Sequence, residues 1–170
     1  MTRHSFDALE IRAPQAVQVV RDVQAWTMES GARVWFGRGK RDGSMIPVFT
    51  HAGSSYYLFA AWTYGAVEIY FNRLKVRPPF DDEGKRLELL RRLNEIPGVV
   101  IPPDGIGRRP SIRLETLAAP EHTQRFLEVL AWTLQEIRAV PPVQDAQESV
   151  EAASVAMPGP RHRSPNRAVG

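Results

Sequence analysis

The sequence YYLFAAWTYGAVEIYFN, which spans residues 56–72, contains the clearest strand signals of the chain. It opens with a continuous apolar run of the kind found in strands that are covered on both faces. Tyr64-Gly65 follows with the composition of a tight hairpin turn. After the turn, apolar and more polar side chains alternate, with Val67, Ile69 and Phe71 on one side and Glu68, Tyr70 and Asn72 on the other. Alternation with a period of two predicts a half-buried strand, so this stretch predicts two antiparallel strands joined by a hairpin turn.

Two more strands are predicted upstream, at residues 33–37 and 44–50. The basic segment GRGKRDGS, residues 37–44, connects them. Pro47 lacks the backbone N–H that strands use for pairing, so we expect the second of these strands to lie at an edge of the sheet or to carry a bulge. The short connections among all four strands favour an antiparallel meander.

Helices are predicted on both sides of these strands in the sequence, at residues 14–30, 81–96 and 120–138. Asp81 and Asp82 are suited to cap the second helix, because carboxylates accept hydrogen bonds from its first free N–H groups. The buried stripe of that helix is expected to consist of Leu87, Leu90, Leu93 and Ile96. A further short strand is expected at residues 112–114. The sequence therefore predicts an α+β fold in which about three helices cover one face of a four-stranded antiparallel meander, in the order α-β-β-β-β-α-(β)-α.

A single domain is predicted at residues 13–140, because a chain of 170 residues can bury one core of ordinary size. Residues 1–12 are polar and are expected to form an N-terminal arm. Residues 141–170 are rich in Ala, Pro, Ser, Gln and Glu and contain no aromatic residue. Such a segment buries too little apolar surface to offset its ordering entropy, so we expect a disordered tail.

Charge and cysteine content limit the functional classes. The net charge is +3, a mild excess that does not by itself indicate nucleic-acid binding. The chain contains no cysteine, which excludes disulfides, thiolate metal sites and a cysteine nucleophile. No apolar run approaches the roughly 18 residues of a membrane span, and the first residues lack the apolar core of a secretory signal. We therefore expect a cytoplasmic protein that does not enter the membrane.

The segment 37–44 is the first candidate binding element. It carries three cations, which are Arg38, Lys40 and Arg41. Glycine-rich loops bind nucleotide phosphates when they lead into a helix, but a strand-like segment with Pro47 follows here, which argues against a nucleotide loop. The cations are instead predicted to contact the backbone of DNA or RNA, and a solvated hairpin loop is the alternative. A second basic turn, at Arg108 and Arg109, is a further candidate for phosphate contact, again with a solvated loop as the alternative.

Aromatic side chains of the predicted strands are the second candidate element. Proteins that bind single-stranded nucleic acid stack bases on sheet aromatics that lie next to basic residues. Tyr70 is the leading stacking candidate because it shares the less apolar face of its strand with Glu68, and Trp35 or Tyr64 would stack beside it. Core or cross-strand packing is the alternative for each. Three apolar residues of the same strands are expected to pack beneath the helices: Phe59, Ile69 and Phe71.

We find no catalytic motif in the sequence. Metal-dependent nucleases of the restriction type need a Glu-x-Lys pair, but Glu68 is followed by Ile69-Tyr70. The four histidines are dispersed without the spacing of metal ligands, and no serine lies in a nucleophile elbow. We therefore expect no metal, no cofactor and no recognisable enzymatic activity.

A pattern of glycine and aromatic motifs extends over residues 14–138. It consists of Trp35-Phe36-Gly37, Gly39-Lys40, Gly43-Ser44, Leu58-Phe59, Trp62-Thr63-Tyr64-Gly65, Val67-Glu68-Ile69 and Pro78-Pro79-Phe80. In this pattern the chain is similar to small uncharacterised bacterial α+β modules that occur alone or appended to restriction and defence nucleases. These motifs mark a fold and carry over no functional residue. The resemblance implies a nucleic-acid context.

Together these features predict a binding module that contacts nucleic acid through its basic hairpin loop. A protein-interaction or regulatory module without nucleic-acid binding is the alternative, and an enzyme of unrecognised type is the third hypothesis.

Overall fold

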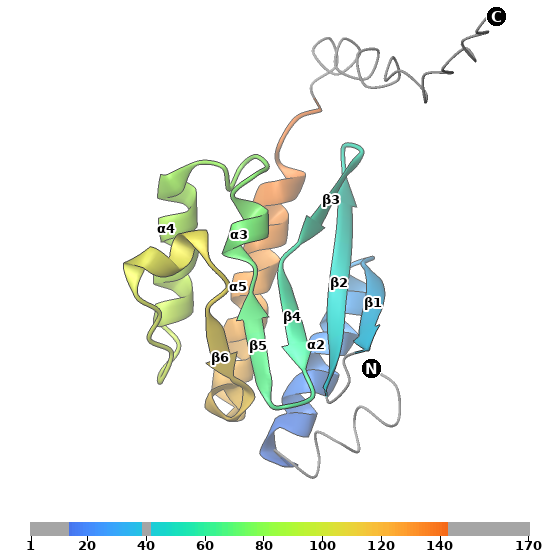
Figure 1. The fold of residues 1–170 in the computed structure, drawn as a ribbon, viewed down its shortest axis with the longest axis vertical. Coiled ribbons are helices and arrows are strands. Elements are labelled where there is room, and N and C mark those ends of the chain that lie inside the picture. The colour runs from blue at the N-terminus through green and yellow to red at the C-terminus, as the bar shows by residue number, and fades with distance from the viewer. Residues whose placement is uncertain (1–13, 39–41, 143–170) are drawn as a thin grey trace, which may run out of the picture. The chain divides into compact units, whose positions relative to one another are not determined.

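The computed structural model describes residues 14–38 and 42–142, except for the side chain of Arg38, and has an α+β fold as predicted (Figure 1). Its helices are α2 (Val17–Glu29), α3 (Phe71–Leu74), α4 (Glu83–Asn94) and α5 (Pro120–Arg138), with short 3-10 turns η1 (Pro14–Ala16), η2 (Pro103–Gly107) and η3 (Leu114–Leu117). Its strands are β1 (Arg33–Arg38), β2 (Gly43–His51), β3 (Ser54–Tyr57), β4 (Phe59–Trp62), β5 (Ala66–Ile69) and β6 (Ser111–Arg113). The predicted N-terminal arm lies outside the described residues, as does the predicted tail from residue 143 onward, so both stay predictions.

The strands form one antiparallel sheet in the order β1-β2-β4-β5-β6, and β3 pairs with β2 away from this path. The prediction of a four-stranded meander was therefore wrong in strand count and order. The apolar run at residues 56–62 is two strands that separate at Leu58, whose carbonyl accepts a hydrogen bond of 2.9 Å from Tyr70 N–H. The short segment at Ser111–Arg113 adds the sixth strand by pairing with β5.

Pro47 lies in the interior of the sheet, so of the two predicted alternatives, an edge strand or a bulge, the edge strand was wrong. The pairing on one side of β2 is interrupted at Pro47, and its register changes by one residue there. One side of β2 pairs with β1, and the other side pairs with β4 at Ser44 and Met45 and with β3 from Val48 onward. Pro47 lies in the interval between these two partners. A residue without an N–H is tolerated there because neither β3 nor β4 continues its ladder past it.

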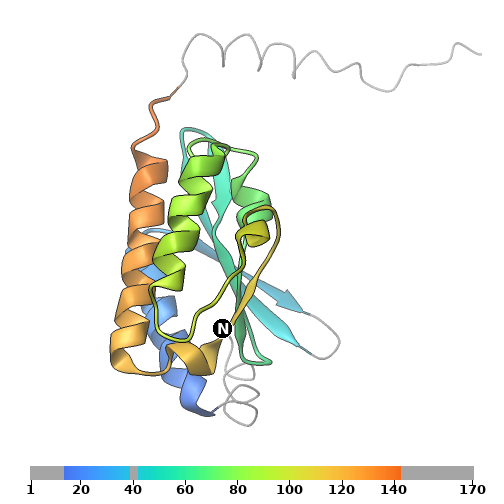
Figure 2. The same ribbon diagram turned by 90° about the vertical axis from the view of Figure 1, so that its left-hand side faces the viewer.

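Helices α2 and α5 cover one face of the sheet, and α4 packs against α5, so the molecule has a sheet layer and a helix layer (Figure 2). The core lies between the layers. Its strand residues include Met45, Phe49, Phe59, Ala61, Val67 and Ile69, and they pack with residues of the helices that include Val20, Val23, Phe126, Leu130 and Leu134. Phe59, Ile69 and Phe71 belong to this core, which confirms the prediction for these three residues.

The start of α4 also confirms its prediction. The side chain of Asp82 accepts a hydrogen bond of 2.8 Å from Lys85 N–H. The predicted buried stripe was wrong in one position: Leu87 is 40% exposed, and Leu89 is buried in its place. At 3.6 residues per turn, Leu87 lies roughly 160° around the helix from Leu89, which directs it away from α5 and the sheet.

Candidate nucleic-acid interface

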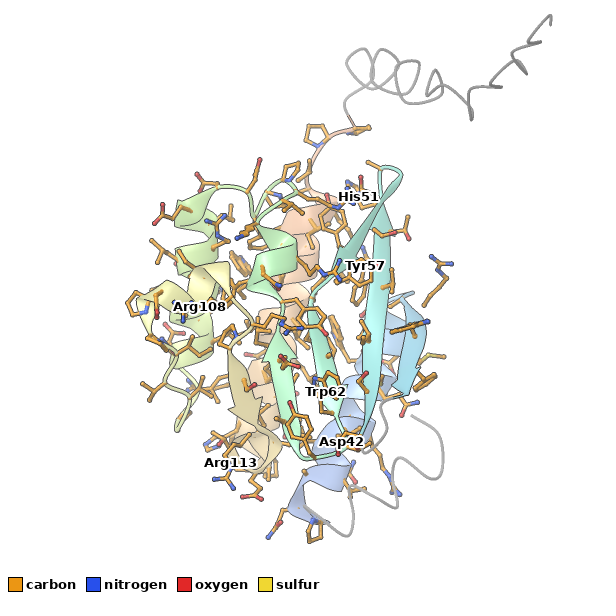
Figure 3. The ribbon with its side chains drawn as sticks, in the orientation of Figure 1. Asp42, His51, Tyr57, Trp62, Arg108 and Arg113 are labelled. Atoms are coloured by element: carbon orange, nitrogen blue, oxygen red, sulfur yellow. The ribbon has the colours of Figure 1, made fainter. Side chains whose placement is uncertain are left out.

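The sheet face opposite α2 and α5, called the open face below, carries side chains of a different kind from the core. Cross-strand register places Trp35 next to Ile46, and Val48 between Arg33 and Tyr57. Farther along the sheet, Ser44 pairs with Trp62, and Glu68 lies between Ala60 and Ser111. Tyr57 and Trp62 are labelled on this face in Figure 3. The open face is therefore rich in Trp, Tyr and Arg.

A cleft of about 500 Å³ lies on the open face. Its lining comes from β1, β2, β3, α3 and the residue that joins β5 to α3, and consists of Arg33, Val34, Trp35, Ile46, Val48, Tyr57, Tyr70 and Arg73. The guanidinium carbon of Arg73 lies 5.3 Å from the centre of the Tyr57 ring, a cation–π contact. The rings of aromatic side chains and the positive charges of arginine side chains therefore lie in one cleft.

Tyr70, the leading stacking candidate from the sequence, forms part of the wall of this cleft and is only 7% exposed. Burial raises the pKa of its hydroxyl, the negative charge of Glu68 raises it further, and the cations Arg109 and Arg73 oppose the shift. Trp35 lies in the same cleft and is 62% exposed, so it offers a much larger ring surface than Tyr70.

A second aromatic pair lies at the other end of the open face, at the turn between β4 and β5. The rings of Trp62 and Tyr64 stack with centroids 5.6 Å apart and planes at 25°. Gly65 completes this turn with a φ of 102°, a left-handed backbone conformation that favours glycine. Tyr64 is 45% exposed, and burial followed by Glu68 raises the pKa of its hydroxyl. Tyr64 therefore offers one ring face to a ligand while Trp62 covers the other.

Strand β1 ends, and strand β2 begins, beside this aromatic pair, and the basic hairpin loop joins the two strands. Arg38 is the last residue of β1 and pairs with Gly43 at the start of β2. Gly43 N–H donates to the Thr63 hydroxyl, and Thr63 N–H donates to the Gly43 carbonyl, both at 3.0 Å. Figure 3 accordingly shows Asp42 near Trp62. Lys40, Arg41 and the side chain of Arg38 lie outside the described residues, so their phosphate contacts stay a prediction.

The two arginines of the second basic turn have different surroundings. Arg109 lies beside the open face, with its Nε 3.8 Å from Glu68 Oε2. Arg108 is paired with Asp104 at 3.6 Å and lies toward α4, apart from Tyr57 and Trp62 (Figure 3). The structure thus brings Arg109 to the candidate interface and leaves Arg108 outside it.

Sequence reasoning missed Arg33 and Arg73 and did not separate Tyr57 from its neighbour Tyr56. Tyr56 is 5% exposed, belongs to the core and donates a hydrogen bond of 3.0 Å to the Pro78 carbonyl. Tyr57 points to the opposite face and lines the cleft. The strand alternation that separates them was hidden, because almost every residue of the run at 56–62 is apolar.

Among the described residues, no three His, Asp or Glu side chains lie close enough to form a metal site. None of the helices in the same part of the chain combines the length and apolar character of a membrane span. No protein-family model, curated protein sequence or solved structure matches this chain.

Proposed function

We propose that this protein is a non-enzymatic module that binds single-stranded nucleic acid on the open face of its sheet. The observation that supports this is the cleft in which Trp35, Tyr57 and Tyr70 meet Arg33 and Arg73. Aromatic rings stack on nucleobases, and guanidinium groups contact phosphate oxygens, so the lining matches both parts of a nucleotide. The cleft volume also lies within the roughly 300–1,000 Å³ of sites that take small ligands.

A single strand fits this face better than a duplex. In a duplex the base faces stack on one another, so aromatic side chains reach them only when the strand is unpaired. Arg109 and Arg113 extend the positive charge toward β6, and the predicted phosphate contacts of Arg38, Lys40 and Arg41 would extend it from the hairpin loop. The proposal includes a cytoplasmic location and the nucleic-acid context implied by the resemblance to small uncharacterised bacterial α+β modules that occur alone or appended to restriction and defence nucleases.

Fluorescence anisotropy with labelled DNA and RNA oligonucleotides of about 12 nucleotides tests the proposal. We expect binding that weakens steeply between about 50 and 200 mM salt, because each neutralised phosphate releases counterions. Tyr57→Ala should weaken binding about 5- to 100-fold, since stacking contributes roughly 1–3 kcal/mol per base. Arg73→Ala should weaken binding and reduce the salt dependence.

Arg125→Ala is the matched control, because it removes one exposed arginine from α5 on the helix layer. It should leave the affinity unchanged. Failure to bind any oligonucleotide would contradict the proposal, and so would an equal loss of affinity in Arg125→Ala and Arg73→Ala.

A protein partner is the second candidate ligand, and strand β1 is the observation that favours it. β1 is the last strand of the sheet in the described residues, and it exposes Trp35 by 62% and Phe36 by 39%. An exposed apolar edge strand is a template for an additional strand from another chain. In that case Phe36→Ser should abolish complex formation with the partner in a pull-down, while the loop substitutions Lys40→Ala and Arg41→Ala should leave the complex intact.

A further inference from the structure

Glu68 places a carboxylate on the surface that we propose for nucleic acid. It lies on β5 between Ala60 of β4 and Ser111 of β6, and its side chain is 14% exposed. Its ion-pair partner in the described part of the chain is Arg109, at 3.8 Å. This distance is too long for a hydrogen bond, so the carboxylate oxygens keep their capacity to accept hydrogen bonds.

Aromatic residues lie on the same face of the sheet as this carboxylate. Trp62 of β4 pairs with Ala66, the residue two positions before Glu68 on β5. The negative charge of Glu68 also contributes, after burial, to the raised pKa of the Tyr64 and Tyr70 hydroxyls. Tyr64 stacks on Trp62 and is 45% exposed, so its outer ring face is accessible to a planar ligand. A base that stacks on Tyr64 would have its edge near Glu68 and Arg109.

A carboxylate on a surface that binds a polyanion is unfavourable unless the ligand supplies hydrogen-bond donors, because like charges repel. An ionised carboxylate can accept two parallel hydrogen bonds. On its Watson–Crick edge, guanine presents two adjacent donors, N1–H and the 2-amino group, followed by the acceptor O6. Adenine, cytosine, uracil and thymine each present one donor group on that edge. The Glu68–Arg109 pair offers two acceptors next to a donor, which complements guanine.

We propose that Glu68 and Arg109 give the open face a preference for guanine. The base stacks on Tyr64, its N1–H and 2-amino groups donate to the carboxylate of Glu68, and Arg109 donates to O6. This inference rests on the proposed binding of single-stranded nucleic acid and adds base selection to it.

The test compares the affinity of the full chain for three labelled oligothymidylates that carry guanine, inosine or adenine at one central position. Inosine keeps N1–H and O6 but lacks the 2-amino group, so it removes one donor. We expect the guanine oligonucleotide to bind about 5- to 100-fold more tightly than the adenine one, with inosine between them, because one bidentate base contact discriminates by roughly that factor. In Glu68→Gln the guanine preference should fall to within about twofold, because an amide presents a donor to one of the guanine donors.

Glu136→Gln is the control, because Glu136 is a carboxylate of α5 in the helix layer, where it pairs with Lys85 of α4 at 2.9 Å; it should keep the full preference. Equal affinity of the wild type for all three oligonucleotides would overturn base selection and leave single-strand binding standing. Absence of binding to all three would overturn both proposals. Equal weakening of all three by Glu68→Gln would assign Glu68 a structural role and overturn the inference. Because guanine and inosine are compared in the wild type, the test does not depend on the folding of the variant.

Discussion

The two faces of the sheet are built from alternate residues of the same strands, yet their chemistry differs completely. Phe59 on β4 is fully buried beneath α5, where its ring lies 6.3 Å from that of Phe126. Its neighbour in sequence, Ala60, belongs to the open face, which carries Tyr57, Trp62 and arginines. Phe has no polar group, whereas Tyr, Trp and Arg combine apolar bodies with polar ends that stay near water. Residues that are adjacent in sequence therefore belong in turn to the core and to the proposed binding surface.

Ala60 is buried on the open face although no helix of the helix layer covers it there. It is 0% exposed although it lies on the face that α2 and α5 do not cover, so neighbouring side chains shield it from solvent. Its cross-strand neighbour on that face is Glu68, and Trp62 follows two residues later along β4. The aromatic side chains of the open face, called the aromatic layer below, are Trp35, Tyr57, Trp62, Tyr64 and Tyr70, and side chains at a surface can move more easily than those of the core.

Truncation of one aromatic residue on each face should give the largest difference in the free energy of unfolding. Phe59→Ala removes a fully buried ring and should cost about 3–5 kcal/mol of the free energy of unfolding. Tyr57→Ala removes a partly exposed ring and should cost less than about 2 kcal/mol while weakening oligonucleotide binding. Urea unfolding monitored by circular dichroism measures both. Equal destabilisation would show that the aromatic layer is a second core.

Enlargement of adjacent alanines should give the next largest effect. Ala61 is 1% exposed and faces the helices, so Ala61→Leu should overpack the core and cost about 1–3 kcal/mol. Ala60→Leu should cost less, because the side chains above it can move outward into solvent. It should nevertheless weaken oligonucleotide binding by disturbing the aromatic layer. If Ala60→Leu destabilised the protein as much as Ala61→Leu, the open face would be packed as tightly as the core, and the difference between the two faces would be contradicted.

The helices α2, α4 and α5, the alternation along β5 and the cap of α4 were predictable because their signals are local. Pro120 at the first turn and the apolar spacing that follows specify α5 regardless of what lies around it. The Asp82 cap needs only the three residues that follow it. Pro47 is different: a missing N–H indicates that one pairing partner is absent, but it does not indicate whether the strand is at an edge or between two partners.

The candidate cleft was less predictable because it combines residues that are distant in sequence. Arg33 and Arg73 are separated by the whole β1–β5 sheet segment, and they reach one cleft only through the pairing of β1 with β2 and of β2 with β3. Arg73 was also missed because the chain turns into α3 just after Tyr70, where the alternation predicted that the strand continues. Tyr70 was identified because strand alternation directs it to the less apolar face of its strand.

Alkaline pH should destabilise the protein through the tyrosines. Burial and, second, Glu68 raise the folded-state pKa of Tyr70 above its ordinary value of 10.0. As the pH rises past about 10, the unfolded chain releases this proton while the folded chain retains it, so the free energy of unfolding should fall. Tyr70→Phe should show a weaker fall between about pH 8 and 11 than the wild type, measured by urea unfolding. Glu68→Gln should also weaken this fall in the free energy of unfolding, since the substitution removes the second cause of the raised pKa of Tyr70. An unchanged pH dependence in both variants would show that the open face does not disfavour tyrosinate.

The smallest change in stability is expected when two equally exposed side chains are truncated, one on the open face and one on the helix layer. This comparison separates an effect on binding from an effect on folding. Trp35 on the open face and Met28 on α2 are both 62% exposed, so each alanine substitution should change the free energy of unfolding by only about 0.5 kcal/mol. Their effects on oligonucleotide binding should differ, because Trp35 lines the cleft and a base that stacks on it loses roughly 1–3 kcal/mol on truncation. Trp35→Ala should therefore weaken binding about 5- to 100-fold, whereas Met28→Ala should leave it unchanged. Since the two side chains are equally exposed, a difference in affinity between the two variants would come from the ring of Trp35 and its place in the cleft. Equal affinity of the two variants would mean that the cleft does not hold a base.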